Sequence, residues 1–259
     1  MSKHFELLQR VSKDDLFDPP KETVQPTQKT STPEPLNDVT LEQACPRTLP
    51  KNGAPEPEIN KLVQRLFSRA GEVTGPRIVS LSGMTEDDRN SWICARTGEA
   101  LAEQSGKSVC MVDADFWSPR LHLHFSAANS AGLAGALATK ISIQNFALPV
   151  SGENLWLVPA GLVKPGFNPS VERYRERFTE LRDAFDYVLI NGPAIGRETQ
   201  TTLIGQLVDG VVLIVKANRS RREAVRRAKE QLERAHVHLL GAVLDQRTFP
   251  IPEKLYRKL

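Results

Sequence analysis

The sequence predicts an α/β protein with a doubly wound, mostly parallel sheet. Three observations lead to this fold class. Apolar runs of strand length alternate with segments of helical periodicity, and most of these runs are uninterrupted, as in strands covered on both faces. One run ends in a glycine and is followed by a polar loop, a helical segment and a second run. Ligands of such sheets bind beyond the carboxyl ends of the strands, so the functional residues are expected there.

The composition is that of an ordinary globular protein. Of the 259 residues, 40% are hydrophobic and 25% are charged, and the net charge of +3 is too small to indicate nucleic acid or a membrane surface by itself. The three cysteines lack metal-ligand spacing, which favours a reducing compartment. The N-terminus has charges where a signal peptide needs an apolar core, and no run has the length of a membrane span. We expect a cytoplasmic protein without a transmembrane segment.

The first 57 residues differ from the rest of the chain. The apolar pattern of residues 1–15 predicts a short amphipathic helix, which is either a docking element or a frayed end. Residues 16–57 are rich in Pro, Thr, Lys and Glu, cannot bury enough apolar surface to fold, and predict a flexible linker. Residues 58–70 predict a helix with one buried apolar stripe. This helix leads into an α/β domain over 58–247, and residues 248–259 form a tail.

The strands and helices of the domain follow from period and length. The predicted strands are Ile78–Ser82, Ser108–Asp113, Leu155–Pro159, Tyr187–Asn191, Gly210–Lys216 and Leu239–Leu244. The predicted helices are Ser91–Gln104, Ser170–Ala184, Glu198–Leu207 and Arg221–Ala235. This order places the Gly83 loop, Asp113–Asp115 and Asn191–Pro193 at the same edge of a parallel sheet.

Several segments resemble one protein family, and the match covers residues 77–245 in order. The segments that carry it are VCMVDADFWSPRLHLHF, LVPAGLVKPGFNPS, FDYVLINGPAIG and VDGVVLIVKANRSRREAVRRA. They resemble the CpsD/CapB-like bacterial tyrosine kinases of exopolysaccharide biosynthesis. This family lies within the P-loop NTPase class that includes the MinD and ParA types. The opening MSKHFELLQR is also similar to the N-terminus of stand-alone cytoplasmic members.

The resemblance implies a P-loop NTPase-like fold and a cytoplasmic protein that works with a membrane polysaccharide co-polymerase or an export or synthase subunit. It could lie at the inner membrane through that partner. Active members bind Mg-ATP and phosphorylate their own C-terminal tyrosines, so ATP and Mg²⁺ are the cofactors to consider. A homo-oligomer is also implied, although Gln64 replaces the second arginine of the family's subunit-contact motif. Sequence-specific binding to nucleic acid is not expected.

The loop departs from a working phosphate site. A P-loop needs glycines that let backbone N–H groups turn inward, a lysine, and a Ser or Thr hydroxyl for Mg²⁺. Counting from Gly83 places Asp88, Arg89 and Asn90 at the Gly, Lys and Ser/Thr positions. Counting back from the helix places Arg89, Asn90 and Ser91 there. Both registers lose the glycine and the lysine. The degenerate nucleotide-binding positions are therefore Gly83, Thr85, Arg89, Asn90, Ser91 and Asn191.

Some of the remaining motif positions match the family's pattern and others do not. The acid expected after the FDYVLI strand is replaced by Asn191, whereas Asp113 and Asp115 are present and would be the catalytic pair of an active enzyme. If ATP binds, Mg²⁺ would be held through Ser91 and Asp113. The tail carries Tyr256 as its single candidate phospho-acceptor instead of a tyrosine cluster.

Three functions remain open. The first is a catalytically degenerate regulatory or scaffold protein of exopolysaccharide biosynthesis, which the broken loop favours. The second is an active tyrosine autokinase or ATPase that uses Arg89 and the two aspartates. The third is a MinD/ParA-type positioning ATPase that uses the arginine-rich helix near residue 227 on an anionic surface.

Overall fold

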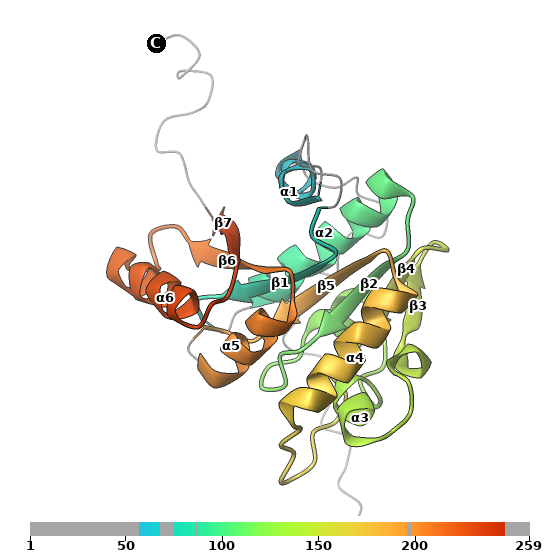
Figure 1. Ribbon diagram of the computed structural model, residues 1–259. Helices are drawn as coiled ribbons and strands as arrows, with labels where there is room; N and C mark the ends of the chain where they lie inside the picture. Colours follow the sequence, from blue (N-terminus) through green and yellow to red (C-terminus); the bar gives the residue numbers. More distant parts are fainter. Residues whose placement is uncertain (1–56, 68–74, 86–87, 196–197, 247–259) are drawn as a thin grey trace, which may run out of the picture. The chain divides into compact units, whose positions relative to one another are not determined.

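A seven-stranded sheet forms the centre of the protein in the computed structural model, which describes residues 57–67, 75–85, 88–195 and 198–246 (Figure 1). These residues lie within one compact unit of the chain, Pro46–Leu259. The strand order is β3-β4-β2-β5-β1-β6-β7, and only β3 runs antiparallel to its neighbour. The strands are β1 (Ile78–Gly83), β2 (Val109–Asp113), β3 (Leu148–Ser151), β4 (Leu155–Val158), β5 (Tyr187–Gly192), β6 (Gly210–Lys216) and β7 (Leu239–Asp245).

Helices cover both faces of the sheet (Figure 1). One face is covered by α1 (Pro57–Phe67) and α2 (Asp88–Ser105), which share a core cluster with β1, β2 and β4. The other face is covered by α3 (Leu133–Ala138), α4 (Val171–Ala184), α5 (Glu198–Leu207) and α6 (Arg222–Arg234). Two 3₁₀ turns, η1 (Leu121–Phe125) and η2 (Ile143–Phe146), lie in the connections.

The central strands are uninterrupted apolar runs because both of their faces are covered. Every residue of β1 and of β2 is buried. Successive strand residues point to opposite faces, so Val79 and Leu81 pack with α1 and α2 while Ile78 packs with α4. The predicted doubly wound, mostly parallel fold is confirmed.

Several predicted boundaries need correction. Helix α2 begins at Asp88, three residues before the predicted start at Ser91, so part of the predicted loop is helical. Strand β3 and helix α3 were not predicted. β3 is a four-residue edge strand that contains Pro149, and α3 has six residues, so neither is long enough to show a clear period. Helix α1 begins at Pro57, one residue inside the predicted linker.

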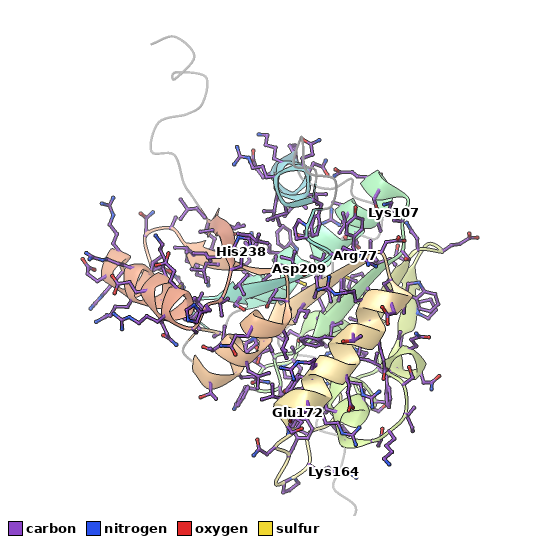
Figure 2. All side chains as sticks on the ribbon, in the orientation of Figure 1. Arg77, Lys107, Lys164, Glu172, Asp209 and His238 are labelled. Carbon is purple, nitrogen blue, oxygen red and sulfur yellow. The ribbon has the colours of Figure 1, made fainter. Side chains whose placement is uncertain are left out.

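The amino end of β1 is held by a polar cluster that includes Arg77 and Asp209 (Figure 2). Asp209 Oδ2 accepts hydrogen bonds from the backbone N–H groups of Arg77 and Ile78, each at 2.8 Å. The Arg77 guanidinium donates to the carbonyl oxygens of three residues at the end of α4 and the start of β5. This cluster fixes the start of β1 beside β5 and β6.

Some predictions fall outside the described residues. They are the N-terminal helix 1–15, the linker apart from Pro57, the end of the helix predicted over 58–70, and the tail with Tyr256; they stay predictions. No helix among the described residues is long and apolar enough to span a membrane.

Candidate functional site

The candidate residues gather at the carboxyl ends of β1, β5 and β2, three neighbouring strands with β5 in the middle. Gly83 closes β1, Asn191 lies near the end of β5, and Asp113 closes β2 directly opposite Asn191 in the strand register. Parallel order brings these residues to one edge, as expected. The first turn of α2 adds Arg89, Asn90 and Ser91 above this edge.

Asp113 is fully buried, and each of its oxygens accepts two hydrogen bonds. Oδ1 accepts from the Asn191 amide at 2.8 Å and from the backbone N–H of Asp115 at 3.3 Å. Oδ2 accepts from the backbone N–H groups of Arg120 and Leu121 at 3.1 and 3.0 Å. The carboxylate thus fixes the loop that follows β2 and leads into η1.

Two opposing effects act on the protonation of Asp113. Burial raises the pKa of its carboxyl group to about 7, and the hydrogen bonds from Asn191 and the backbone N–H groups act in the other direction. An aspartate in place of Asn191 would remove a donor and add a like charge. The Asn191 amide therefore stabilises the charged form of Asp113 by donating a hydrogen bond to it.

Asn90, in the first turn of α2, packs against Gly83 at the end of β1. A Cβ atom built on Gly83 would lie 2.0 Å from Asn90 Nδ2, so the amide rests directly on the glycine backbone. The same Nδ2 donates to the carbonyl oxygen of Thr85 at 2.9 Å. Asn90 is 8% exposed. The predicted loop glycine is thus needed for close approach of a side chain of the protein itself.

Arg89 contacts the end of β7, the last strand of the chain among the described residues. Its guanidinium donates to both oxygens of Asp245 at the end of β7, at 3.2 and 2.7 Å. It also lies over the ring of Trp92, 4.1 Å from the centroid. This bidentate geometry is the strong form of an arginine–carboxylate pair. The structure therefore places Arg89 with a carboxylate of the last strand.

The remaining candidate site residues are Ser91, Asp115 and Thr85. Ser91 is buried, and its hydroxyl lies 3.1 Å from His124 Nε2 on η1. Asp115 Oδ1 accepts hydrogen bonds from the backbone N–H groups of Trp117 and Ser118, each at 3.1 Å. Asp115 thus organises its own turn. Thr85 is exposed at the loop and takes part through its carbonyl oxygen.

The structure adds two residues that the sequence did not indicate as site residues. Asp245 ends β7, and its place at the carboxyl end of a strand was the available signal. His124 follows a Pro-x-Leu-His stretch, and nothing in its spacing points to Ser91. Among the described residues, no group of three or more His, Cys, Asp or Glu side chains could hold a metal ion.

The strand order and the helices on both faces of the sheet match the fold of P-loop NTPases. Over 146 residues the chain is 30% identical to the tyrosine-protein kinase YwqD of Bacillus subtilis, a match that covers 55% of this chain and 61% of that protein. The chain thus spans about three fifths of that relative's length, 61%. No protein-family model matches the chain.

Solved structures show the same fold. The chimerical protein CapA2B2 aligns with a TM-score of 0.67 at 20% identity, over 74% of this chain and 84% of that one. The MinD cell division protein of Aquifex aeolicus aligns with a TM-score of 0.57 at 19% identity, over 70% and 72%. The predicted resemblance to bacterial tyrosine kinases and to MinD-type P-loop proteins is confirmed.

Proposed function

We propose that this chain is a catalytically degenerate relative of the bacterial tyrosine kinases. It acts as a regulatory or scaffold subunit of exopolysaccharide biosynthesis, with a membrane polysaccharide co-polymerase or export complex as its partner. The observation that carries the proposal is the hydrogen bond between Asn191 and Asp113, 2.8 Å long and buried at the centre of the site.

The residues present do not fit Mg-ATP. The side chain of Asn90 covers Gly83, where backbone N–H groups of a working loop surround phosphate oxygens. Both oxygens of Asp113 already accept hydrogen bonds, and Asn191 presents an N–H donor toward them. A cation at this point would meet, in place of a second carboxylate, a neutral amide whose Nδ2 donates to Asp113 and whose Oδ1 is buried without a hydrogen-bond partner among the described residues.

The active-kinase alternative needs Arg89 to replace the missing lysine. Arg89 instead makes a bidentate pair with Asp245, whose side chain is 5% exposed. Moving the guanidinium to a phosphate would leave a buried carboxylate without that partner, which is unfavourable. This geometry counts against the alternative.

The positioning-ATPase alternative needs a cationic face on α6. Three cations of its middle and C-terminal part are paired within the helix: Arg226 and Arg234 with Glu230, and Lys229 with Glu233. These acid–base pairs support the helix itself. They favour a solvated helix face over a surface for polyanions.

Restoring the loop tests the proposal. The variant Asp88→Gly/Arg89→Lys/Asn90→Ser/Asn191→Asp regains the glycine, the lysine, the hydroxyl and the acid of a working site. We expect it to bind Mg-ATP at least about tenfold more tightly than the wild type, since each charge-assisted hydrogen bond contributes about 1.5–3 kcal/mol. Isothermal titration calorimetry measures the difference.

The matched control carries Arg89→Ala with the other three changes, so that only the lysine is missing. It should bind Mg-ATP more weakly than the restored variant. Equal affinities of the wild type and the restored variant for Mg-ATP would contradict the proposal that the loop has lost its nucleotide-binding residues.

A further inference from the structure

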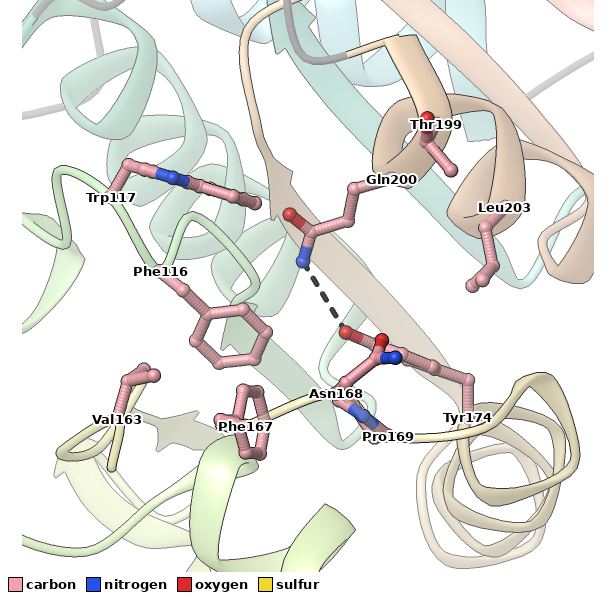
Figure 3. Close-up of a pocket in the computed structure, with 10 residues that line it drawn as sticks. All are labelled: Phe116, Trp117, Val163, Phe167, Asn168, Pro169, Tyr174, Thr199, Gln200 and Leu203. Carbon is pink, nitrogen blue, oxygen red and sulfur yellow. Dashed lines mark hydrogen bonds between the residues drawn. The ribbon is translucent and has the colours of Figure 1, made fainter. Parts of the chain in front are cut away.

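A cavity at the turn after β2 has its own chemistry (Figure 3). Its volume is about 810 Å³, within the range of pockets that bind small molecules. Its walls come from the turn after β2, the loop before α4, and helices α4 and α5. The residues that matter for its chemistry are Phe116, Trp117, Phe167, Asn168, Tyr174 and Gln200.

Aromatic rings supply the apolar part of the pocket. Phe116 and Phe167 pack edge to face with their centroids 5.2 Å apart. Trp117 is 51% exposed, although large aromatic side chains usually bury most of their surface. Its backbone N–H is held by Asp115 Oδ1 at 3.1 Å, which fixes the start of this ring platform. A half-exposed ring on a fixed turn is suited to stacking against a ligand.

Gln200 supplies one buried acceptor atom that has no partner among the described residues. Figure 3 shows its side chain between Trp117 and Tyr174, with Nε2 donating to the Tyr174 hydroxyl at 3.3 Å. The other amide atom, Oε1, is buried and has no hydrogen-bond partner among the described residues. An unsatisfied buried acceptor is costly, so a ligand that donates a hydrogen bond to it gains affinity.

The charge of the walls restricts the ligand. None of the described residues that line the pocket is charged. An anion would face the negative ring faces, and a cation would find no carboxylate in these walls to replace its hydration. The ligand expected from these walls is neutral, with one flat apolar face and hydroxyl groups at its edge.

We propose that this pocket binds a neutral saccharide. A pyranose ring presents C–H groups on one face, which can pack on Trp117 and Phe116. Its hydroxyls both donate and accept, as the carboxamides of Gln200 and Asn168 require. The described lining of this pocket includes none of the candidate nucleotide-binding residues, so the proposal does not depend on whether Mg-ATP binds.

The indole N–H resonance of Trp117 reports on the site. The chain has three tryptophans, and Trp117→Phe assigns the resonance in a ¹⁵N correlation spectrum of the full chain. The probes are maltotriose, cellotriose and tri-N-acetylchitotriose, with trigalacturonate, choline and N-acetyl-tyrosinamide as charged and aromatic comparisons. We expect a saturable shift with at least one neutral trisaccharide below ~10 mM, and weaker or no shifts with the comparison compounds.

Two variants test the assigned contacts by calorimetry. Trp117→Ala and Gln200→Ala should each weaken saccharide binding by about tenfold, the effect of losing one ring contact or one buried hydrogen bond. The control Ile141→Ala, an exposed apolar residue outside the pocket, should leave it unchanged. Saturation only by choline or N-acetyl-tyrosinamide, no shift with any neutral saccharide, or equal binding by all three variants would overturn the proposal.

Discussion

The variant Asp113→Ala is expected to lower the free energy of unfolding by about 3–5 kcal/mol, the usual cost of breaking a buried polar network. The substitution removes an acceptor that satisfies three backbone N–H groups and the Asn191 amide. The lost acceptor leaves these donors buried without partners. Urea unfolding of the full chain at pH 7 measures the effect.

Asp115→Ala is the matched control two residues away. Asp115 accepts from two backbone N–H groups in its own turn, so its loss should cost roughly 1–2 kcal/mol. A catalytic role predicts a different pattern, in which Asp113→Ala leaves stability within about 1 kcal/mol of the wild type and abolishes a measurable turnover. That pattern would contradict a structural role for Asp113.

The second large effect is expected from Asn191→Asp, which places two buried carboxylates side by side. The pKa of Asp113 is already raised by burial to about 7 in the folded protein, and its ordinary value is 3.8. Losing the amide donor and adding a like charge both raise it further. The folded variant then holds a proton that the unfolded chain releases, so its stability falls as pH rises from about 4 through neutrality and beyond.

We therefore expect Asn191→Asp to be destabilised by about 1 kcal/mol at pH 5 and by about 3–5 kcal/mol at pH 8, relative to wild type. Thermal and urea unfolding across this pH range measure the difference. Asn191→Ala is the control, because it removes the same donor without adding a charge and should show a flatter dependence. A destabilisation of Asn191→Asp that is equal at both pH values would contradict the account of the pair.

Much of the fold follows from the sequence because burial on both faces leaves uninterrupted apolar runs. The strand predicted over Gly210–Lys216 and the helix over Glu198–Leu207 match the structure residue for residue. Strand β3 escapes prediction because it lies at the edge, is mostly exposed and carries a proline. The start of α2 is missed because its first turn is polar and adds no apolar period.

Some contacts of the candidate site also follow from the sequence, and others do not. The meeting of Asp113 with Asn191 follows from parallel strand order, since both residues end neighbouring strands. The partner of Arg89 does not follow, because Asp245 lies 156 residues away and the carboxyl edge offers several acids. The position of Asn90 over Gly83 also needs coordinates, since either register of the loop allowed an asparagine at a polar position. Tertiary contacts, more than local propensity, decide these partners.

The most direct test of the central claim is a calorimetric titration of the purified wild-type chain with Mg-ATP and Mg-ADP, with phosphotyrosine detection on the same sample. The proposed function predicts no saturable heat below ~1 mM nucleotide and no phosphotyrosine, because Asn90 packs on Gly83 and Arg89 is paired with Asp245. Binding in the micromolar range, together with phosphotyrosine that appears with time, would contradict it.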